Sequence, residues 1–274
     1  MTSQRTFAIC AIAVAGAIAF SGCSAPSTPT TSGGVTLVKP GTLTACINLP
    51  FKPMEYKDDS GVVVGFDVDV VNLVAAQLGT TVTVVESDFD QITSGALFAA
   101  KKCDIAASSI TITDARAQAI NFSKPYFAAT QGLAATAASG IHGLADLSGK
   151  KVAVESNTTG QDYANANADQ YGFEVVVFDD AGAALNSILS GRVDACLVDL
   201  AIVTDFVRSN DVMAVAAQFS TNETYGIAAA KTDNGAALIT AVNSALDKAN
   251  TDGTYLQLYQ KWIDPSATSA SLPS

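Results

Sequence analysis

The chain has 274 residues, a formal net charge of −11 and 49% hydrophobic residues. This length allows one large domain or two small ones, with enough apolar residues for a sizeable core. The acidic balance argues against a nucleic-acid-binding protein, because contacts to phosphates need clustered Lys and Arg, and the chain has no basic stripe.

Residues 1–22 are typical of a lipoprotein signal peptide. One Arg precedes an apolar run over residues 7–20, and Ser21-Gly22 leads directly into Cys23. The run is too short to span a bilayer comfortably, so it predicts export and cleavage before Cys23. Cys23 resembles the acylated cysteine of a bacterial lipobox, although Phe20 departs from the usual Leu. A plain secretory signal with an incidental cysteine is the alternative.

Residues 23–39 are predicted to be a flexible tether, since Ser24–Gly34 is mostly Ser, Thr, Pro and Gly without charge. No later apolar run is long enough for a transmembrane helix. We therefore expect the folded part to be anchored by a lipid on Cys23 to the outer face of the bacterial cell membrane.

Three cysteines lie in the folded part, at Cys46, Cys103 and Cys196. All lie in or next to apolar, strand-like segments, so the sequence favours buried free thiols. A Cys46–Cys103 bridge is the less favoured alternative. The chain has one His, and no Cys and His spacing fits a metal site, so we expect no metal and no other cofactor.

Strand-like and helix-like segments alternate in the first half of the folded part. The predicted strands are at 42–49, 81–86 and 104–108, and the predicted helices at 67–78 and 92–100. Asp67 is a candidate N-cap and Gly79 a candidate stop for the first helix. This βαβαβ order predicts a parallel sheet with helices on its faces.

A second series of the same kind follows. It predicts strands at 151–154, 174–178 and 195–198, and helices at 158–171, 181–190 and 200–207. A strand at 226–230, a helical region at 235–262 and a frayed tail after Pro265 complete the chain. The two halves share their topology without obvious sequence repetition.

The segment Ser109–Arg116 carries the strongest chemical signal. Two hydroxyls and one guanidinium lie where a predicted strand passes into a helix, with Thr113 as a candidate N-cap. Open α/β sheets bind their ligands at such a place. Because Arg suits a bidentate contact with a carboxylate, the segment predicts a receptor for a small carboxylate.

Four motifs in the right order resemble the family 3 solute-binding proteins, the polar amino acid receptors of ABC importers. The motifs are Gly65–Val70 with Val74-Ala75 and Leu78, Ser108–Arg116, Leu147–Val154, and Asp252–Tyr255 through Lys261-Trp262. The resemblance covers roughly residues 43–263.

The resemblance implies an α/β, two-lobed, periplasmic-binding-protein-like fold of type II. Each lobe would be a mostly parallel sheet flanked by helices. Lobe 1 would comprise residues 40–128 and 223–265, lobe 2 residues 129–222, and the tail residues 266–274. Two hinge segments, near 127–130 and 222–225, would let the lobes close over a ligand.

The resemblance also implies how the ligand's carboxylate is bound. Arg116 would clamp the α-carboxylate, with Ser109 and Thr111 as further donors. Thr158 and Thr159 would complete the cage from a helix N-terminus in lobe 2. Taken alone, Ser109 and Thr111 also suit ordinary capping at a strand end.

Asp199 would accept hydrogen bonds from the α-ammonium group, and a role as helix N-cap is the alternative. Phe51 and Phe89 would stack on the ligand's side chain, unless they only anchor their loops. Asn48 lies where several relatives carry Asp. Asp67, like Asp69, is interpreted as structural, serving as a helix cap or first-turn charge.

Glu155 bears most directly on specificity. It ends a predicted strand and is expected to point toward the cleft, where it would pair with a cationic side chain. The alternative is an exposed Glu that pairs with Lys150 or Lys151. The case for a basic ligand is modest, and Asn48 in place of Asp weakens it.

Together these interpretations predict a membrane-tethered extracellular receptor that binds a free amino acid, polar or basic, and delivers it to an ABC transporter permease. We expect a monomer without catalytic residues and without a nucleic-acid partner. Two alternatives stay open. One is an exported dehydratase-type enzyme with Glu155 as general acid, and the other is a ligand-sensing module for a separate signalling partner.

Overall fold

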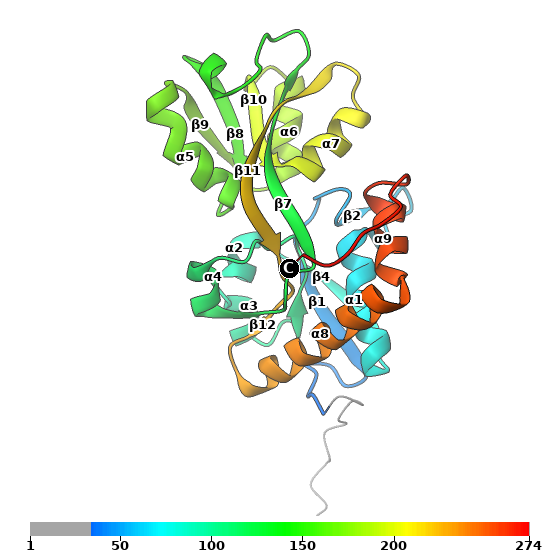
Figure 1. The fold of residues 1–274 in the computed structure, drawn as a ribbon. Coiled ribbons are helices and arrows are strands. Elements are labelled where there is room, and N and C mark those ends of the chain that lie inside the picture. The colour runs from blue at the N-terminus through cyan, green and yellow to red at the C-terminus, as the bar shows by residue number, and fades with distance from the viewer. Residues whose placement is uncertain (1–33, 274) are drawn as a thin grey trace, which may run out of the picture.

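The computed structural model describes residues 34–273 and contains two five-stranded sheets and one two-stranded sheet. Each larger sheet forms the centre of one lobe, and Figure 1 shows the two lobes one above the other. The predicted signal peptide, Cys23 and most of the predicted tether lie outside the described residues. No helix within residues 34–273 is long and apolar enough to cross a membrane.

Lobe 1 is built on a sheet with the strand order β4-β1-β5-β12-β6. β1 pairs in parallel with β4 and β5, whereas β12 runs antiparallel to β5 and β6. Its strands are β1 (Thr42–Ile47), β4 (Thr81–Glu86), β5 (Ile105–Ala106), β6 (Ile120–Phe122) and β12 (Ala228–Ala230), with the small hairpin β2 (Tyr56–Lys57) and β3 (Val63–Val64) beside them. The parallel part confirms the prediction from the βαβαβ order.

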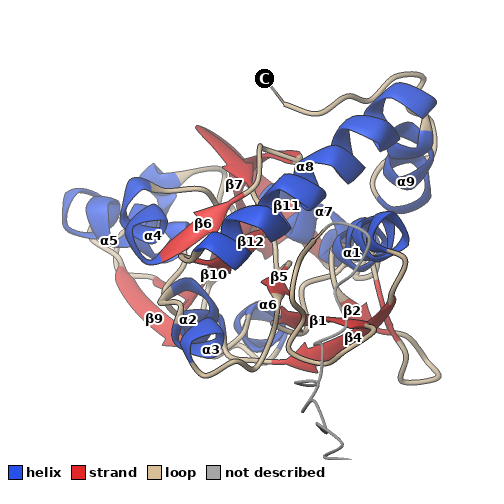
Figure 2. Cartoon of the chain, turned by 90° about the horizontal axis from the view of Figure 1, so that it is seen from below, coloured by secondary structure: helices blue, strands red, loops and turns tan. Residues whose placement is uncertain are grey.

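Three longer helices cover lobe 1, and Figure 2 shows α8 running across its sheet beside α1 and α9. They are α1 (Phe66–Leu78), α8 (Asp233–Asp252) and α9 (Thr254–Trp262), and the short helices are α2 (Phe89–Thr93), α3 (Ala96–Ala99) and α4 (Asp114–Ala119). The predicted single helix at 92–100 is wrong, because Gly95 adopts a φ of 79° and separates α2 from α3.

Lobe 2 is built on a sheet with the order β11-β7-β10-β8-β9. Its elements are β7 (Phe127–Thr136), η1 (Leu144–Leu147), β8 (Lys151–Glu155), α5 (Thr159–Tyr171), β9 (Glu174–Phe178), α6 (Ala181–Leu189), β10 (Ala195–Asp199), α7 (Leu200–Arg208) and β11 (Met213–Tyr225). The predicted elements of this half agree with these bounds to within one or two residues. The sequence predicted no strand at β7 or β11, only hinge segments near 127–130 and 222–225.

β7 and β11 form the two-segment hinge. They pair antiparallel from Met213–Thr136 to Tyr225–Phe127, with a register shift between Phe219 and Glu223. Figure 1 shows both strands running from lobe 2 into lobe 1. The lobe boundaries given above remain predictions.

The start of α1 differs from the prediction. The N-cap is Gly65, with a φ of 141°, and a Cβ there would lie 2.0 Å from the Met54 carbonyl oxygen. Asp67 is therefore not the cap. It lies inside the helix, fully buried, and its carboxylate accepts hydrogen bonds from Ser109 and Tyr126. Gly79 ends α1 in the left-handed conformation, as predicted.

Cys46 and Cys103 form a disulfide, so the expectation of free thiols is wrong for this pair. Cys46 lies in β1, and Cys103 lies two residues before β5, which pairs with β1. This pairing brings the two Cα atoms to 5.6 Å, within the range that a disulfide spans. Cys196 is a buried free thiol, as expected.

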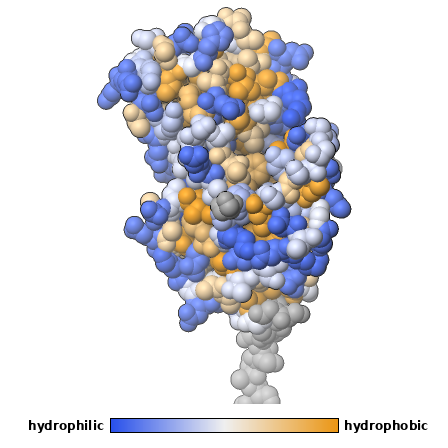
Figure 3. Space-filling model, in the orientation of Figure 1, coloured by the Kyte–Doolittle hydropathy of each residue, from blue (hydrophilic) through white to orange (hydrophobic). Residues whose placement is uncertain are grey.

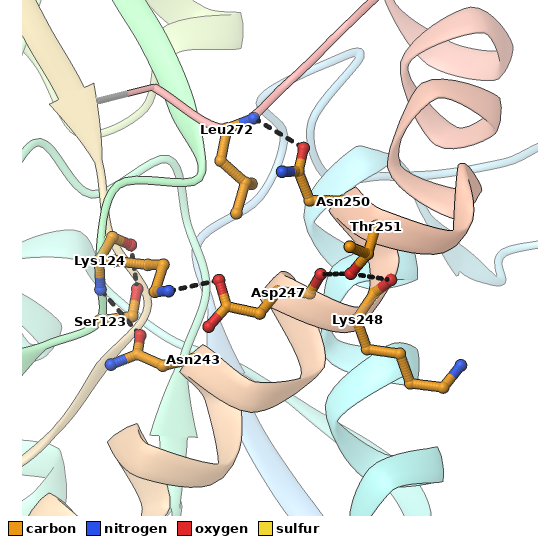
Figure 4. Close-up of polar contacts among 8 residues, drawn as sticks. All are labelled: Ser123, Lys124, Asn243, Asp247, Lys248, Asn250, Thr251 and Leu272. Atoms are coloured by element: carbon orange, nitrogen blue, oxygen red, sulfur yellow. Dashed lines mark hydrogen bonds and ion pairs between the residues drawn. The ribbon is translucent and has the colours of Figure 1, made fainter.

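The tail after Pro265 packs against lobe 1 instead of fraying. The Leu272 N–H donates to Asn250 Oδ1 in α8 at 3.2 Å, and the Leu272 side chain packs against the core. Figure 4 shows this contact beside the segment that leads into β7, where Lys124 pairs with Asp247 and its N–H donates to Asn243. α8 thus holds both the tail and the lower end of a hinge strand.

Candidate ligand-binding site between the lobes

A small cavity lies between the lobes. Its lining contains all ten residues that the sequence predicted, together with Ser108. The lining residues are Asn48, Phe51, Phe89, Ser108, Ser109, Thr111, Arg116, Glu155, Thr158, Thr159 and Asp199. Ser108 was missed as a site residue although it belongs to the same motif as Ser109. In Figure 3 apolar residues gather near the waist between the lobes.

The loop after β5 forms the floor of the cavity in lobe 1. Ser109 adopts a left-handed φ of 47°, and its N–H donates to Asp67 Oδ2 at 2.7 Å. The Ser108 hydroxyl donates to Glu55 Oε1 at 2.9 Å and accepts from the Asn48 N–H at 2.9 Å. Buried polar partners therefore hold this loop from below.

The far end of the same loop is held by the hinge. Thr111 forms an isolated antiparallel bridge with Tyr225, and the Ile112 N–H donates to the Thr224 carbonyl at 2.9 Å. The loop therefore joins the cavity to the end of β11. The Ser109 hydroxyl is buried and has no hydrogen-bond partner among the described residues. A polar group in the cavity would satisfy it.

Arg116 lies in the first turn of α4, where its N–H donates to the predicted cap Thr113 at 3.2 Å. Its guanidinium lies over the Phe89 ring, with the guanidinium carbon 5.1 Å from the ring centre. One nitrogen donates to the Thr111 carbonyl at 2.9 Å, and another crosses to lobe 2 and donates to the Asn157 carbonyl at 2.8 Å. Arg116 thus links the two lobes at the edge of the cavity.

Glu155 is the last residue of β8 and is 3% exposed. Its Oε1 has no hydrogen-bond partner among the described residues. Lys150 and Lys151 pair with Asp194 and Glu174 instead, so the alternative of an exposed, Lys-paired Glu155 is wrong. Burial, with repulsion from Asp180 and Asp199, raises the pKa of Glu155 to about 8 despite the nearby Arg116.

Asp199 ends β10 and is half-buried. Gln131 Nε2 in β7 donates to its Oδ1 at 2.8 Å and also donates to Glu223 Oε2 in β11 at 2.9 Å. Asp199 occupies the N-cap position of α7, but its side chain makes no capping hydrogen bond. Burial and repulsion from Glu223 raise its pKa to about 7. The carboxylate therefore remains available to the cavity.

The N-terminus of α5 faces the loop of lobe 1. Thr158 caps the helix by accepting from the Gln161 N–H at 3.1 Å, and Asn157 adopts a left-handed φ of 60°. The hydroxyls of Thr159 and Thr111 are 3.5 Å apart across the cleft. The two lobes are therefore in contact here.

The two aromatic residues occupy different surroundings. Phe51 is 7% exposed and packs in the core while it lines the cavity. Phe89 is half-buried, and Arg116 covers one face of its ring. The Asn48 amide donates to the Ser87 carbonyl at 3.0 Å, so it is held in place. The ligand roles of these residues stay predictions.

The cavity combines one cation, two carboxyl groups and several hydroxyls. Arg116 lies in lobe 1, whereas Glu155 and Asp199 lie in lobe 2. Such a set suits a small zwitterion, because each of its charges finds a partner of opposite sign. The second acidic group suits a ligand that carries one further positive charge.

Two curated proteins and one solved structure show what the chain is similar to. It is 33% identical to the lysine/arginine/ornithine-binding periplasmic protein of Escherichia coli (strain K12), over 82% of this chain and 88% of that protein. It is 30% identical to the L-cystine-binding protein TcyJ of the same strain, over 83% and 85%. An ancestral arginine-binding protein bound to arginine is 34% identical, covers 81% of this chain and 98% of its own, and has a TM-score of 0.76.

The profile of the bacterial extracellular solute-binding proteins, family 3, matches residues 43–265. This range contains both five-stranded sheets except for Thr42, the first residue of β1, together with the hinge and every residue that lines the cavity. The motifs, the two-lobed fold and the match to relatives at 30% identity or more agree. The chain therefore belongs to the bacterial extracellular solute-binding proteins, family 3.

Proposed function

We propose that this protein is an extracellular receptor for a free amino acid with a cationic side chain, which it binds between its lobes and delivers to an ABC importer. One observation carries the proposal. A single cavity brings together Arg116 of lobe 1 and the two carboxyl groups of Asp199 and Glu155 from lobe 2. The relatives named above, which bind lysine, arginine, ornithine or cystine by name, support the class of ligand.

Arg116 and Asp199 would bind the parts that all amino acids share. The guanidinium would take the α-carboxylate together with the hydroxyls of Ser109 and Thr159, and Asp199 would accept from the α-ammonium group. Because these partners belong to opposite lobes, a bound zwitterion favours the closed state over the open one. In the present closed arrangement Arg116 already donates to lobe 2 through Asn157.

Glu155 would select the side chain. It is buried and lines the cavity, and its Oε1 has no hydrogen-bond partner among the described residues. A guanidinium or ammonium group beside it would draw off its proton and form a charged pair, whereas a second carboxylate would be repelled. Phe51 would provide an apolar surface for the aliphatic stem.

The test is a thermal-shift series on the chain from Ser24 onward, unfolded and refolded to remove any bound ligand. The ligands are arginine, lysine, ornithine, citrulline, glutamine, cystine and glutamate. A ligand that binds the folded state raises the melting temperature. We expect the largest shifts with arginine, lysine or ornithine, and a smaller one with citrulline, which has the shape of arginine without its charge. The largest shift with glutamate, or none with any of them, would contradict the proposal.

A second function has one observation in its favour. A neutral, buried carboxyl group such as Glu155 at pH 7 is also what a general acid needs. We propose binding without reaction. Its check is to incubate the protein with each binding amino acid and with a cyclohexadienyl acid and to follow both by NMR. A product that the Glu155→Gln variant fails to form would establish the enzyme instead.

We further propose that a lipid on Cys23 anchors the receptor to the membrane, on the strength of the signal-like residues 1–22. A Cys23→Ser variant expressed in a bacterial host should lose incorporation of labelled fatty acid and move from the membrane fraction to the soluble exported fraction. A variant that stays membrane-bound would contradict the lipid anchor and leave the ligand proposal intact.

A further inference from the structure

Two buried carboxyl groups lie directly beneath the loop that forms the floor of the cavity. Glu55 and Asp67 are both fully buried in lobe 1, and neither lines the cavity. Asp67 lies in α1, and Glu55 precedes β2. Two negative charges buried together are unfavourable unless a proton or a cation compensates them.

The hydrogen bonds assign the charge to Asp67. Its Oδ2 accepts from the Ser109 N–H at 2.7 Å, and its Oδ1 accepts from the Tyr126 hydroxyl at 2.7 Å. Both partners are donors, which an ionised carboxylate satisfies and a protonated one satisfies less well. Asp67 is therefore the acceptor of the pair.

The surroundings of Glu55 are those of a neutral acid. Its Oε1 accepts from the Ser108 hydroxyl at 2.9 Å, and its Oε2 has no donor among the described residues. Burial, followed by repulsion from Asp67, raises the pKa of Glu55 well above its ordinary value, and a hydrogen bond between the two carboxyl groups is among the further causes. A proton on Oε2 satisfies this oxygen and donates to Asp67.

We propose that Glu55 and Asp67 share one proton and that this protonated pair positions Ser108 and Ser109 for the ligand. Glu55 orients the Ser108 hydroxyl, and Asp67 holds the Ser109 backbone in its left-handed turn. Both serines line the cavity. The pair touches no ligand and acts through these two residues, so Glu55 and Asp67 are positioning residues.

Several titratable groups face the pair from other elements. Tyr126 and Tyr225 lie at the ends of the hinge strands, and burial raises the pKa of each well above its ordinary value. Glu155 of β8 acts on Glu55 from lobe 2 through weaker repulsion. The groups that shift the pKa of Glu55 are Asp67, Ser108 and Glu155, and none of these three is a cation. Loss of the shared proton would therefore leave two uncompensated charges under the loop.

The role in ligand positioning rests on the proposed function, whereas the shared proton does not. The first measurement is therefore made without ligand. The amide resonance of Ser109 is followed by NMR while the pH is raised, in the wild-type chain from Ser24 onward and in Glu55→Gln. A Gln side chain donates to Asp67 and accepts from Ser108 without carrying a proton that titrates.

We expect the Ser109 amide to shift with a midpoint well above the ordinary pKa of a glutamate in the wild type and to lose this shift in Glu55→Gln. A Ser109 amide that titrates equally in both proteins, or in neither, would overturn the shared proton. This outcome does not depend on whether arginine binds. If arginine fails to bind but Glu55→Gln abolishes the pH-dependent shift of the Ser109 amide, only the proposed function is contradicted.

The second measurement is the affinity for arginine at pH 7. Glu55→Leu removes the proton donor and the partner of Ser108, and we expect binding about tenfold weaker, with Glu55→Gln restoring most of the loss. In Asp67→Asn the side-chain NH₂ group faces either the Ser109 N–H or the Tyr126 hydroxyl, which are both donors. This variant should therefore weaken binding by tenfold or more. If Asp67→Asn fails to fold, the two Glu55 variants decide the question.

Asp104 provides the matched control. It is also a buried acid of lobe 1, and it accepts from the Val38 and Thr44 N–H groups at 2.6 and 2.8 Å, away from the cavity. We expect Asp104→Asn to lower the melting temperature while it changes the affinity by less than twofold. An equal loss of affinity in Asp104→Asn and Glu55→Leu would reduce the pair to an ordinary structural role.

Discussion

The two walls of the cavity are held in place by different means. The wall in lobe 1 is a loop fixed from below by Glu55 and Asp67 and from behind by the end of β11. The wall in lobe 2 consists of strand ends and a helix N-terminus, and its acidic groups keep unpaired oxygens or raised pKa values. Lobe 1 therefore has a wall fixed by internal hydrogen bonds, whereas the wall in lobe 2 carries acidic groups with raised pKa values.

This difference suggests how the two walls divide their roles. Changes at Arg116 or Ser109 in lobe 1 should weaken binding of every amino acid, because these residues would contact the α-carboxylate that all amino acids share. Changes at Glu155 should discriminate between ligands, because only the side chain reaches it. The predictions below test this division, from the largest expected effect to the smallest.

The largest effect is expected at Arg116. Removal of its guanidinium in Arg116→Ala leaves the ligand's carboxylate without its charged partner and breaks the link to Asn157. Charge-assisted hydrogen bonds contribute about 1.5–3 kcal/mol each, so we expect a loss of a hundredfold or more for every ligand. Isothermal titration calorimetry measures it.

The control is Arg192→Ala in lobe 2. Arg192 also lies over an aromatic ring, with its guanidinium carbon 4.9 Å from the centre of the Phe178 ring, but it does not line the cavity. The Arg192→Ala variant should bind each amino acid with the affinity of the wild type. A normal affinity in Arg116→Ala would overturn the site assignment.

The next effect concerns the stability of lobe 1. The disulfide joins residues separated by 57 positions, and closing a loop of this length in the unfolded chain contributes about 4 kcal/mol in the chain-entropy account. We expect the double variant Cys46→Ser/Cys103→Ser to unfold at a lower urea concentration, with a free energy of unfolding reduced by about this amount. Its affinity for arginine, measured while it is folded, should stay within about threefold. Equal urea midpoints would contradict the prediction.

Glu155→Gln tests the selective wall. We expect about tenfold weaker binding of arginine and little change for citrulline, measured by calorimetry at pH 7. In the wild type, burial raises the pKa of Glu155 to about 8, so the carboxyl group must lose its proton to pair with a cation. The affinity for arginine should therefore rise by at most about tenfold per pH unit up to about pH 8 and then level off.

Citrulline separates this effect from that of Asp199, whose pKa of about 7 gives both ligands the same trend. The ratio of the two affinities should follow Glu155 alone and become independent of pH in Glu155→Gln. A ratio that does not change with pH in the wild type would remove Glu155 from side-chain recognition.

The smallest effect is expected where the lobes touch outside the cavity. Gly182 in α6 faces Pro50 of lobe 1, and a Cβ at Gly182 would lie 2.8 Å from the Pro50 ring. Gly182→Val should act as a wedge that opposes closure and weaken all ligands by a few fold. Small-angle scattering with saturating arginine should show a larger radius of gyration than for the wild type. Gly143→Ala, where a Cβ meets nothing within 4 Å, is the control.

The sequence by itself determined the family, the order of most elements and the ten predicted residues that line the cavity. Local signals suffice for the order of the elements, whereas the resemblance to a known family supplied most of the site residues. Thr113 and Thr158 cap their helices by accepting hydrogen bonds from residues three positions later in the chain, and β-branched runs such as residues 81–86 form strands. The motif Ser108–Arg116 is continuous, so its residues reach the site together.

Only the tertiary structure decided the remaining features, because each depends on residues far apart in the chain. β7 has four Ala among its ten residues, and its length follows from pairing with β11 about 90 residues later. The Cys46–Cys103 bond depends on strand pairing in lobe 1. The role of Asp67 likewise changed from helix cap to buried acceptor, because Ser109 and Tyr126 reach it only once the chain has folded.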